Sequence, residues 1–515
     1  MDHLPQVFLL LALFFFTFRI IFQRKQRGPI KGLLPPGPWK LPILGSLHHM
    51  VGSPLPHHTL RELSKRHGPL MHLQLGEVPT VVVSSAEAAK EVLKTQGLNF
   101  ATRPEIPSMK LCSYGFKDII MGPYGANWRQ LRKICHSELL SAKRVESFGF
   151  IIEEEVSNLI RAVRASVEPK RAAAMINLSK LVCAAINNMT ARSAFGDRSR
   201  HQEAFLVAMR EGLRLAGGFN AADLFPSWNF LPAITGLKYR VEELHRKFEE
   251  IFNNIIEEHR TKHSSRKEKK MSSYEDLVDV LLRLQRDGNL EIPISDDCIK
   301  AVILDVFVAG TESARNIVIW AFSELMKNPR TLRKAQEEVR RIVNLGGNKT
   351  DHFRELNYMK CIIKETLRLH PPGPLLIPRE SRASCEVNGF LIPSGTRVLT
   401  NAWAIGRDAR YWGDDAEVFR PERFVEINDE VDFMGANFEF IPFGAGRRMC
   451  PGIGYGLATV ELPLAHLLRD FDWELPHGMK PEELDMAEQF GAAVARRTDL
   501  CLLVPFPLRR EGYYN

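Results

Sequence analysis

Residues 440–456, with the sequence FIPFGAGRRMCPGIGYG, combine one cysteine, two adjacent arginines and five glycines. Such glycine density marks backbone that bends sharply or lets another group come close. Helical spacing of apolar residues begins at Leu457, so Cys450 is expected just before the first turn of a helix. Amide groups at a helix N-terminus favour negative charge, which lowers the pKa of a thiol and suits a thiolate that binds metal.

Three common roles have to be weighed for a cysteine in such a segment. A single cysteine is most often a small buried hydrophobic side chain. A phosphate-binding loop would need the pattern G-x-G-x-x-G, but Gly444-Ala445-Gly446 is followed by Arg-Arg-Met. Structural zinc would need C-x-x-C or H-E-x-x-H, and the sequence has neither. A thiolate without a second protein ligand nearby is expected where a macrocycle supplies the other ligands, as in thiolate-ligated haem.

The spacing Phe443-x-x-Gly446-x-Arg448-x-Cys450-x-Gly452 resembles the haem-binding signature of the cytochrome P-450 monooxygenases. The chain is similar over almost its whole length to the plant-type microsomal members that act on specialised metabolites. The resemblance implies one large, mainly helical domain with a small β portion. It also implies haem b (iron protoporphyrin IX) with Cys450 as the axial iron ligand, and Phe443, Gly446 and Arg448 as further cofactor-binding residues.

The longest predicted helix runs from Ser295 to Asn328, because Ser295 is a good N-cap and Pro329 ends the helical spacing. Its middle, residues 309–313 (AGTES), interrupts an otherwise apolar helix. Glycine weakens a helix, and hydroxyl side chains can bond back to a carbonyl group. This segment is therefore predicted to be a place where a ligand approaches the helix.

The same segment resembles the oxygen-binding groove of the family, where an acid precedes an alcohol. The resemblance implies that Glu312 and Ser313 are the catalytic pair and deliver protons. The family usually has threonine where this chain has Ser313, and the lost methyl group leaves the hydroxyl less restricted. Arg315 is also unusual for the family. Helical spacing points it away from Ser313, so we expect it to be paired or exposed, away from the chemistry.

Four residues match the positions at which the family binds the haem propionates. Trp128 and Arg132 lie in the sequence WRQLRK, which resembles the corresponding helix, and Arg379 and Arg448 match the other positions. Arginine suits this role because its planar fork pairs bidentately with a carboxylate.

Three further residues resemble a structural triad of the family. Glu365 and Arg368 form an E-x-x-R pattern, and Arg423 lies in the sequence PERF. A buried triad of this kind is stable only when every charge is matched. We assign it to folding of the haem pocket and to no chemical step.

Substrate-facing positions follow from the resemblance alone. Most of them are apolar, which implies a lipophilic substrate held by shape. Asp305 is the acidic exception; it could hold an amine, although a structural role is more common at this position. The predicted positions are Ile106, Ile120, Phe219, Val302, Asp305, Val306, Ala309, Leu375, Ile377, Ala492 and Ala493.

Composition limits the environment and the partners of the chain. It has 515 residues, a formal charge of +8 and eight cysteines without disulfide-like spacing, which favours a reducing compartment. Basic residues form no stripe interleaved with aromatic residues, so a nucleic acid partner is not expected. A membrane surface or an acidic protein fits the charge better. Residues 260–270, RTKHSSRKEKK, are predicted to be an exposed loop, and runs at Leu70–Leu75 and Thr80–Ser84 are predicted strands.

Residues 7–22, VFLLLALFFFTFRIIF, form an almost wholly apolar run that is followed by positive charge at Arg24, Lys25 and Arg27. A cleavable signal peptide has the reverse order, and the positive-inside rule places the rest of the chain in the cytosol. We therefore predict a single-pass anchor in the endoplasmic reticulum membrane over residues 1–28. A proline-rich hinge over 29–42 and the haem-binding catalytic domain over 43–515 would follow. A buried amphipathic helix is the alternative to an anchor.

The function implied by the resemblance is reductive activation of O₂ and oxidation of a lipophilic plant specialised metabolite. Electrons would come from NADPH through a separate NADPH-cytochrome P-450 reductase. A sesqui- or diterpenoid is the favoured substrate. Oxidation or ring rearrangement of an alkaloid or phenolic is the alternative within the family, as is an isomerase or dehydratase that needs no reductase. A non-catalytic haem-binding membrane protein is the alternative from another class.

Overall fold

The computed structural model describes residues 33–52, 54–168, 172–196, 202–215, 220–265, 274–343, 355–426, 431–491 and 493–506. The predicted anchor and two predicted substrate-facing residues, Phe219 and Ala492, lie outside these ranges. Among the helices within them, none has both the length and the apolar character that crossing a membrane requires.

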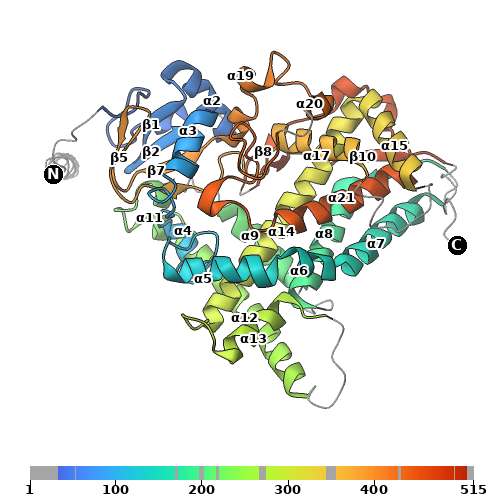
Figure 1. Ribbon diagram of the computed structural model, residues 1–515, viewed down its shortest axis with the longest axis horizontal. Helices are drawn as coiled ribbons and strands as arrows, with labels where there is room; N and C mark the ends of the chain where they lie inside the picture. The colour runs from blue at the N-terminus through green and yellow to red at the C-terminus, as the bar shows by residue number, and fades with distance from the viewer. Residues whose placement is uncertain are drawn as a thin grey trace, which may run out of the picture.

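Helices make up most of the described chain, as expected for a mainly α fold with a small β portion (Figure 1). Strands β1, β2, β5 and β7 lie at one end of the molecule, and α7, α15 and α17 lie at the other. The α-helices are α2 (Pro56–His67), α3 (Ala86–Lys90), α4 (Pro107–Lys110), α5 (Ala126–Ile134), α6 (Ala142–Ser147), α7 (Gly149–Val167), α8 (Leu178–Phe195), α9 (Gln202–Leu215), α10 (Ala221–Leu224), α11 (Leu231–Ile234), α12 (Leu237–Ser265), α13 (Leu277–Asp287), α14 (Asp296–Lys327), α15 (Pro329–Val343), α17 (Asn357–Leu369), α18 (Ala402–Ile405), α19 (Ala409–Trp412), α20 (Glu422–Glu426) and α21 (Ile453–Asp470).

The strands are short and form one larger and three two-stranded sheets. They are β1 (Leu70–Leu75), β2 (Val78–Val83), β3 (Ala174–Asn177), β4 (Arg379–Glu380), β5 (Cys385–Val387), β6 (Phe390–Ile392), β7 (Arg397–Thr400), β8 (Glu488–Gln489), β9 (Ala495–Arg496) and β10 (Cys501–Val504). The larger sheet has the order β1-β2-β7-β4, in which β2 and β7 are parallel and the other pairs antiparallel. The other sheets pair β10 with β3, β5 with β6 and β8 with β9.

The helix predicted from Ser295 to Asn328 is confirmed as α14, with Ser295 as its N-cap and Asn328 as its C-cap. The Ser295 side chain accepts a hydrogen bond from the N–H of Cys298, which satisfies one of the free amides of the first turn. Its 32 residues span about 48 Å, and it packs against α8, α17 and α21. Helix α14 therefore contributes residues to both of the large core clusters.

The described part of the proline-rich segment lies along the sheet. The carbonyl oxygen of Pro36 accepts a hydrogen bond of 2.8 Å from the N–H of His72 in β1. A Cβ atom on Gly37 would lie 1.9 Å from the carbonyl oxygen of His72, so only glycine fits this contact. These contacts fix the segment to the body of the protein before the first helix begins.

The prediction of an exposed loop over residues 260–270 is wrong for residues 260–265, because α12 continues to Ser265. Arg260 forms an ion pair with Asp296 at 2.8 Å, and the hydroxyl of Thr261 donates to the carbonyl oxygen of Glu257 at 2.8 Å. The ion pair joins α12 to the start of α14, which is a contact that the charge composition of residues 260–270 does not indicate. Residues 266–270 lie outside the described ranges.

Candidate active site

The segment that contains Cys450 is held in a bend ahead of α21, which begins three residues further on at Ile453. The N–H of Cys450 donates to the carbonyl oxygen of Phe443 at 3.0 Å, which closes the bend. Gly446 has a φ of +68°, and a Cβ atom there would lie 2.0 Å from the carbonyl oxygen of Leu93. Glycine is therefore required at this position for conformational and steric reasons.

The expected lowering of the pKa of the Cys450 thiol is not found. Burial raises this pKa, and the N–H of Gly452 and the charge of Arg132 offset the effect only in part. The sequence shows the helix N-terminus but not the depth at which the sulfur lies, so burial was underestimated. A coordinating metal ion removes the proton of a thiol outright.

Four buried or half-buried guanidinium groups lie near the cysteine segment. Burial lowers the pKa of Arg448 to about 9, and the charge of Arg379 adds to this effect. Burial lowers the pKa of Arg379 to about 10. Burial and the charges of Arg448 and Arg379 also lower the pKa of Arg103. Arg132, whose pKa is lowered by burial, donates to the carbonyl oxygen of Met449.

These arginines fit the two propionate groups of haem. The Nη2 atom of Arg379 donates to the carbonyl oxygen of Ala445 at 2.9 Å, but its buried Nη1 has no hydrogen-bond partner among the described residues. A buried cation without a partner is costly, and an anion beside it removes that cost. The pKa values of Arg103, Arg379 and Arg448 are all lowered, because nearby negative charge does not compensate for the burial of these three cations.

Trp128 does not have a free indole N–H. Its Nε1 donates to the carbonyl oxygen of Ile119 at 3.0 Å, and the guanidinium carbon of Arg448 lies 3.9 Å from the centre of the ring. The Nε and Nη2 atoms of Arg448 donate to the carbonyl oxygens of Ala101 at 2.7 Å and Gly122 at 2.6 Å. Both side chains are thus held by the protein itself, and Trp128 positions Arg448 by a cation–π contact.

Arg103 is the member of this cluster that the sequence did not reveal. Its Nε donates to the carbonyl oxygen of Ile120 at 2.9 Å, and its Nη1 donates to those of Ile377 at 2.7 Å and Pro378 at 2.8 Å. It therefore joins two segments that were predicted to face the substrate. In the sequence, Arg103 is only an arginine that precedes Pro104, and this pattern does not distinguish it from an arginine in a surface loop.

The middle of α14 carries two hydroxyl groups that bond back along the helix, as predicted. The hydroxyl of Thr311 donates to the carbonyl oxygen of Phe307 at 2.9 Å. The hydroxyl of Ser313 donates to the carbonyl oxygen of Ala309 at 2.6 Å. Ala309 is exposed although it lies in mid-helix, which indicates open space on this side of α14. Ser313 is half-buried beside this space.

Arg315 forms an ion pair of 2.7 Å with Glu312, and its Nη1 also contacts the sulfur of Cys183 in α8 at 3.5 Å. Burial alone would lower the pKa of Arg315, but the charge of Glu312, the contact with Cys183 and the charge of Asp499 together raise it. Arg315 is therefore paired, as expected, but its partner is the residue that the resemblance marks as the catalytic acid.

Asp305 binds backbone and is not free to hold an amine. Its Oδ2 accepts hydrogen bonds from the N–H groups of Ile119 at 2.7 Å and Ile120 at 2.9 Å. Burial, and then the charge of Asp118, raise the pKa of Asp305 well above its usual range. The carboxyl group ties the 118–122 segment to α14, which agrees with a structural role.

The other predicted substrate-facing residues are distributed over three apolar clusters. Ile106 and Ile120 pack together with Phe116 and Met121. Val302 and Val306 belong to the cluster between α14, α9 and α12, whereas Leu375 belongs to one with β1 and β2. Ile377 is 42% exposed, and Ala493 is half-buried.

The structure brings Glu365, Arg368 and Arg423 together in the interior. Arg368 donates to both carboxylate oxygens of Glu365 at 2.7 Å, and the Nε of Arg423 donates to Oε1 at 2.9 Å. The side chains of Glu365 and Arg368 have no exposed surface, and that of Arg423 is 5% exposed. Arg368 also donates to the carbonyl oxygens of Gly406 and Ala416, both at 2.6 Å. The triad thus joins α17 to the irregular segment before α20.

A chain with this helical fold, one cysteine ahead of α21 and a group of buried arginines beside it has the architecture of a haem-thiolate monooxygenase. The family profile of the cytochromes P-450 matches residues 35–501, and the chain belongs to this family. It is a haem-iron oxidoreductase of specialised metabolism.

Characterised relatives are similar over almost the full length. The chain is 50% identical to a desmethyl-deoxy-podophyllotoxin synthase of Sinopodophyllum hexandrum, over 96% of this chain and 95% of the relative. It is 49% identical to a premnaspirodiene oxygenase of Hyoscyamus muticus, over 98% of this chain and 100% of the relative. A zebra fish cytochrome P-450 solved with progesterone superposes with a TM-score of 0.73 at 25% identity, over 88% of this chain and 99% of that chain.

Proposed function

We propose that the protein hydroxylates or epoxidises a sesqui- or diterpenoid. The observation that carries this proposal is the apolar character of the residues beside the open side of α14, of which Val302, Val306 and Ala309 lie on the helix itself. Asp305 does not offer a free charge, because its carboxyl group binds two backbone N–H groups. The similarity to a premnaspirodiene oxygenase over the full length supports the same class of substrate.

Haem would be held by Cys450 at the iron and by Arg132, Arg379 and Arg448 at its propionates. When bound there, it supplies the activation of O₂ that inserts one oxygen atom into the substrate, with electron donation from the thiolate. The buried Nη1 of Arg379 is the donor best placed to gain a partner. Phe443 and Gly446 would shape the bend around the sulfur.

Glu312 and Ser313 would move protons at the oxygen-binding side of α14. The hydroxyl of Ser313 holds its proton against the carbonyl oxygen of Ala309, and Glu312 lies one residue before it. Arg315 stabilises the ionised carboxylate of Glu312 through the 2.7 Å ion pair. A proton taken up by Glu312 would weaken this ion pair, so proton transfer at the acid would be coupled to movement of Arg315.

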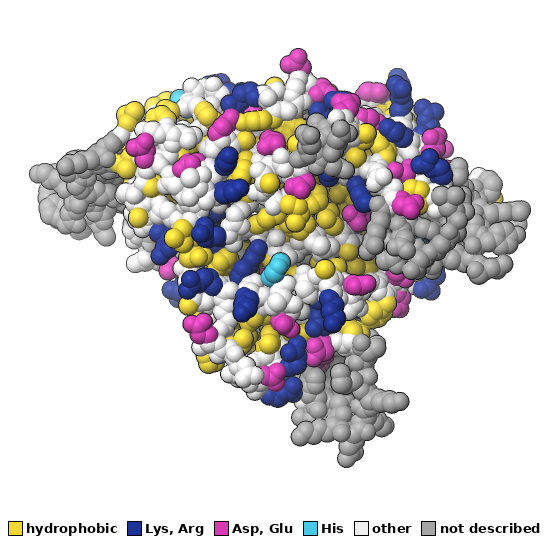
Figure 2. All heavy atoms as spheres, in the orientation of Figure 1, with side chains coloured by type: hydrophobic (Ala, Val, Ile, Leu, Met, Phe, Trp, Pro, Cys, Tyr) yellow, Lys and Arg dark blue, Asp and Glu magenta, His cyan; other side chains and the backbone are white. Residues whose placement is uncertain are grey.

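Electrons would come from an NADPH-dependent reductase that docks near the cysteine segment. Arg129 and Lys133 are exposed on α5, and Arg447 is exposed in the cysteine segment itself. On the face shown in Figure 2, Lys and Arg side chains gather around the position of α5. Basic side chains of this kind attract an acidic partner and speed its association at low salt.

The catalytic domain over residues 43–515 would lie in the cytosol, on an endoplasmic reticulum anchor over residues 1–28 and the segment 29–42. This assignment rests on the apolar run and the basic residues after it. Asn177, Asn188 and Asn348 all lie in N-x-S/T acceptor patterns. We expect none of them to be glycosylated in a eukaryotic host, and a mass shift removed by a glycosidase would contradict the orientation.

The substrate proposal is tested by expressing the protein with a reductase and screening a panel of terpenoids, alkaloids and phenolics by mass spectrometry. We expect NADPH-dependent products from terpenoids, with a gain of one oxygen atom. Binding of the same compounds is measured as a shift of the Soret band. Products from alkaloids or phenolics alone would identify the alternative substrate class, and products formed without NADPH would indicate an isomerase or dehydratase.

Replacing Ser313 with threonine or alanine tests the proton-transfer role. Ser313→Thr is expected to raise the product formed per NADPH consumed, or to shift the product ratio, because the added methyl group restricts the hydroxyl. Ser313→Ala is expected to lower this coupling sharply and to leave substrate binding nearly unchanged. Product, peroxide and NADPH are measured together in the three proteins. The same coupling in all three would assign Ser313 to packing only.

A further inference from the structure

Two adjacent histidines at the start of α2 both contact the same carboxylate oxygen. The Nε2 atoms of His57 and His58 lie 2.8 Å and 3.1 Å from Oε2 of Glu488, which belongs to β8. His57 is fully buried, and the side chain of Glu488 is 8% exposed. These nitrogen and oxygen atoms all lie within 4.8 Å of one another, as the ligands of a single metal ion do.

A third imidazole, that of His370, approaches the same carboxylate from the end of α17. Its Nδ1 is buried, has no hydrogen-bond partner among the described residues and lies 3.8 Å from Oε1 of Glu488. Its Nε2 lies 2.7 Å from Oε1 of Glu324 and, since a carboxylate only accepts, donates to it. Nδ1 therefore faces the second carboxylate oxygen of Glu488 from beyond hydrogen-bond distance.

The contact between Glu324 and His370 orients this third imidazole, because its distal N–H is held by a carboxylate. The ring of His370 is also stacked on Trp320, with centroids 4.1 Å apart and planes inclined by 2°. The ring of His58 is stacked on Trp403, with centroids 4.0 Å apart. Two of the three imidazoles are thus oriented before any ion binds.

We propose that His57, His58 and Glu488 bind one Zn²⁺ ion, separate from the haem site, with His370 beside the carboxylate as an outer partner. In a tetrahedral zinc site with bonds of about 2.0–2.1 Å, ligand atoms lie about 3.3–3.4 Å apart. The separations of the two Nε2 atoms from Oε2 of Glu488, 2.8 and 3.1 Å, are hydrogen-bond distances, so zinc would replace the Nε2 protons and widen both separations. Imidazole nitrogens with one carboxylate are a donor set that zinc favours.

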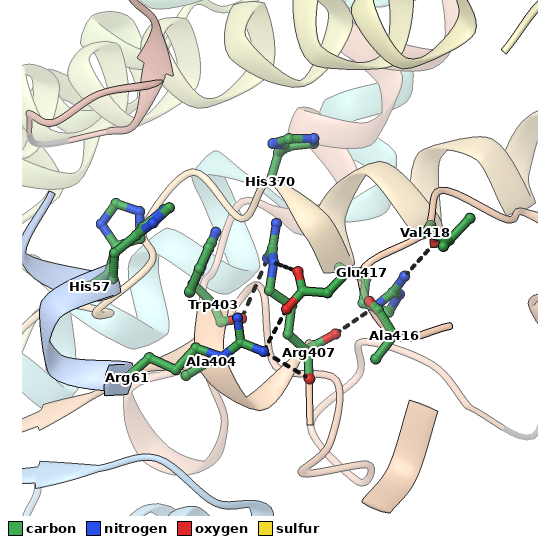
Figure 3. A network of polar contacts seen from close by, with 12 residues as sticks. His57, Arg61, His370, Trp403, Ala404, Arg407, Ala416, Glu417 and Val418 are labelled. Carbon is green, nitrogen blue, oxygen red and sulfur yellow. Dashed lines mark hydrogen bonds and ion pairs between the residues drawn. The ribbon is translucent and has the colours of Figure 1, made fainter. Parts of the chain in front are cut away.

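An open path leads to the site. A cavity of about 490 Å³ is lined by His58, His370, Trp403 and Glu488. Figure 3 shows the side of this region where Arg61 and Arg407 meet Glu417. Arg61 lies 2.5 Å and Arg407 lies 3.0 Å from Glu417, which pairs both positive charges, and the charge of Glu488 also acts on Arg407.

A second group of similar composition does not share these properties. His259, Asp276 and Asp279 are close enough to hold an ion, but both ring nitrogens of His259 are engaged, with Ile255 at 2.7 Å and Asp276 at 3.0 Å. Asp276 is also the N-cap of α13 and accepts from the N–H of Asp279. This group is a helix cap, and it offers no unpartnered ring nitrogen like that of His370.

The proposal is tested on the haem-loaded protein with any affinity tag removed. The protein is freed of metal with a chelator and titrated with ZnCl₂ in equilibrium dialysis, and bound zinc is measured per haem. His58→Gln and Glu488→Gln each remove one ligand. His58 is suited to this test because its side chain is 41% exposed, so its replacement leaves the fold intact. His67→Gln, at the other end of α2, is the matched control.

We expect the wild type and the control to bind one equivalent of zinc, and the two ligand variants to bind it on the order of tenfold more weakly or worse. Zinc is also expected to raise the melting temperature of the wild type and of the control alone, because it binds the folded state. Equal binding by all four proteins would overturn the proposal. Absence of zinc binding by the wild type would also overturn the proposal. In that case the histidines and Glu488 form a hydrogen-bonded group without a metal ion.

Discussion

Replacing Cys450 with serine is expected to abolish the red-shifted Soret band that the reduced protein forms with carbon monoxide. This band reports a thiolate ligand, and a serine hydroxyl at the same position would not be ionised at neutral pH. The structure presents Cys450 ahead of α21 with the charge of Arg132 beside it. The difference spectrum of the reduced protein with carbon monoxide measures the loss directly, and the expected effect is complete.

The matched control is Cys135→Ser. Cys135 is buried and Cys450 is half-buried, and the charge of Arg132 acts on both thiols. Burial raises the pKa of Cys135 to about 12, so it is an inert thiol. This variant is expected to keep the band. Loss of the band in Cys135→Ser, together with its retention in Cys450→Ser, would reverse the assignment of the ligand.

Replacing Glu365 with alanine is expected to leave little haem-loaded protein. The carboxylate accepts two hydrogen bonds from Arg368, one from Arg423 and one from the N–H of Arg420. Its removal takes the carboxylate partner from buried Arg368 and leaves Arg423 with Asp415 alone, which costs about 3–5 kcal/mol. Haem content per protein and the thermal unfolding midpoint both measure this loss. Normal haem content and a normal unfolding midpoint would mean that Glu365 and Arg368 stabilise the protein no more than a surface ion pair does.

The control for this variant is Glu243→Ala. Glu243 and Arg246 have the same spacing of three residues on a helix and lie 2.8 Å apart, but the side chain of Arg246 is 65% exposed. Water replaces the lost partner at such a site, so haem content and stability are expected to stay close to those of the wild type. The contrast separates burial of the charges from their spacing in the sequence.

Local signals allowed much of the fold to be predicted. The N-cap Ser295 and the stop at Pro329 defined α14 because both act within one turn of the helix end. The strand at Leu70–Leu75 was predicted with its observed bounds, and the one at Thr80–Ser84 overlaps β2, because both runs carry a local strand pattern. The contact of Glu365 with Arg423 followed from resemblance to a family, since no spacing in one sequence indicates a contact over 58 residues.

Contacts between distant segments were missed for the same reason. Arg103 reaches carbonyl groups 17 to 275 residues away, and His57 meets Glu488 across 431 residues. The pKa of Cys450 was predicted in the wrong direction because burial depends on the whole fold. Helix α12 was ended too early, because the ion pair of Arg260 with Asp296 connects segments whose proximity the sequence does not show.

The hydroxyl of Ser313 has a single proton, and the carbonyl oxygen of Ala309 already accepts it at 2.6 Å. A hydroxyl can donate to one acceptor at a time, so serving any other acceptor requires this bond to break first. The exchange takes one donor from a helix carbonyl and turns the hydroxyl about its Cβ–Oγ bond. If Ser313 delivers the proton as proposed, the fraction of time in which its hydroxyl has left Ala309 would set how often that proton is available.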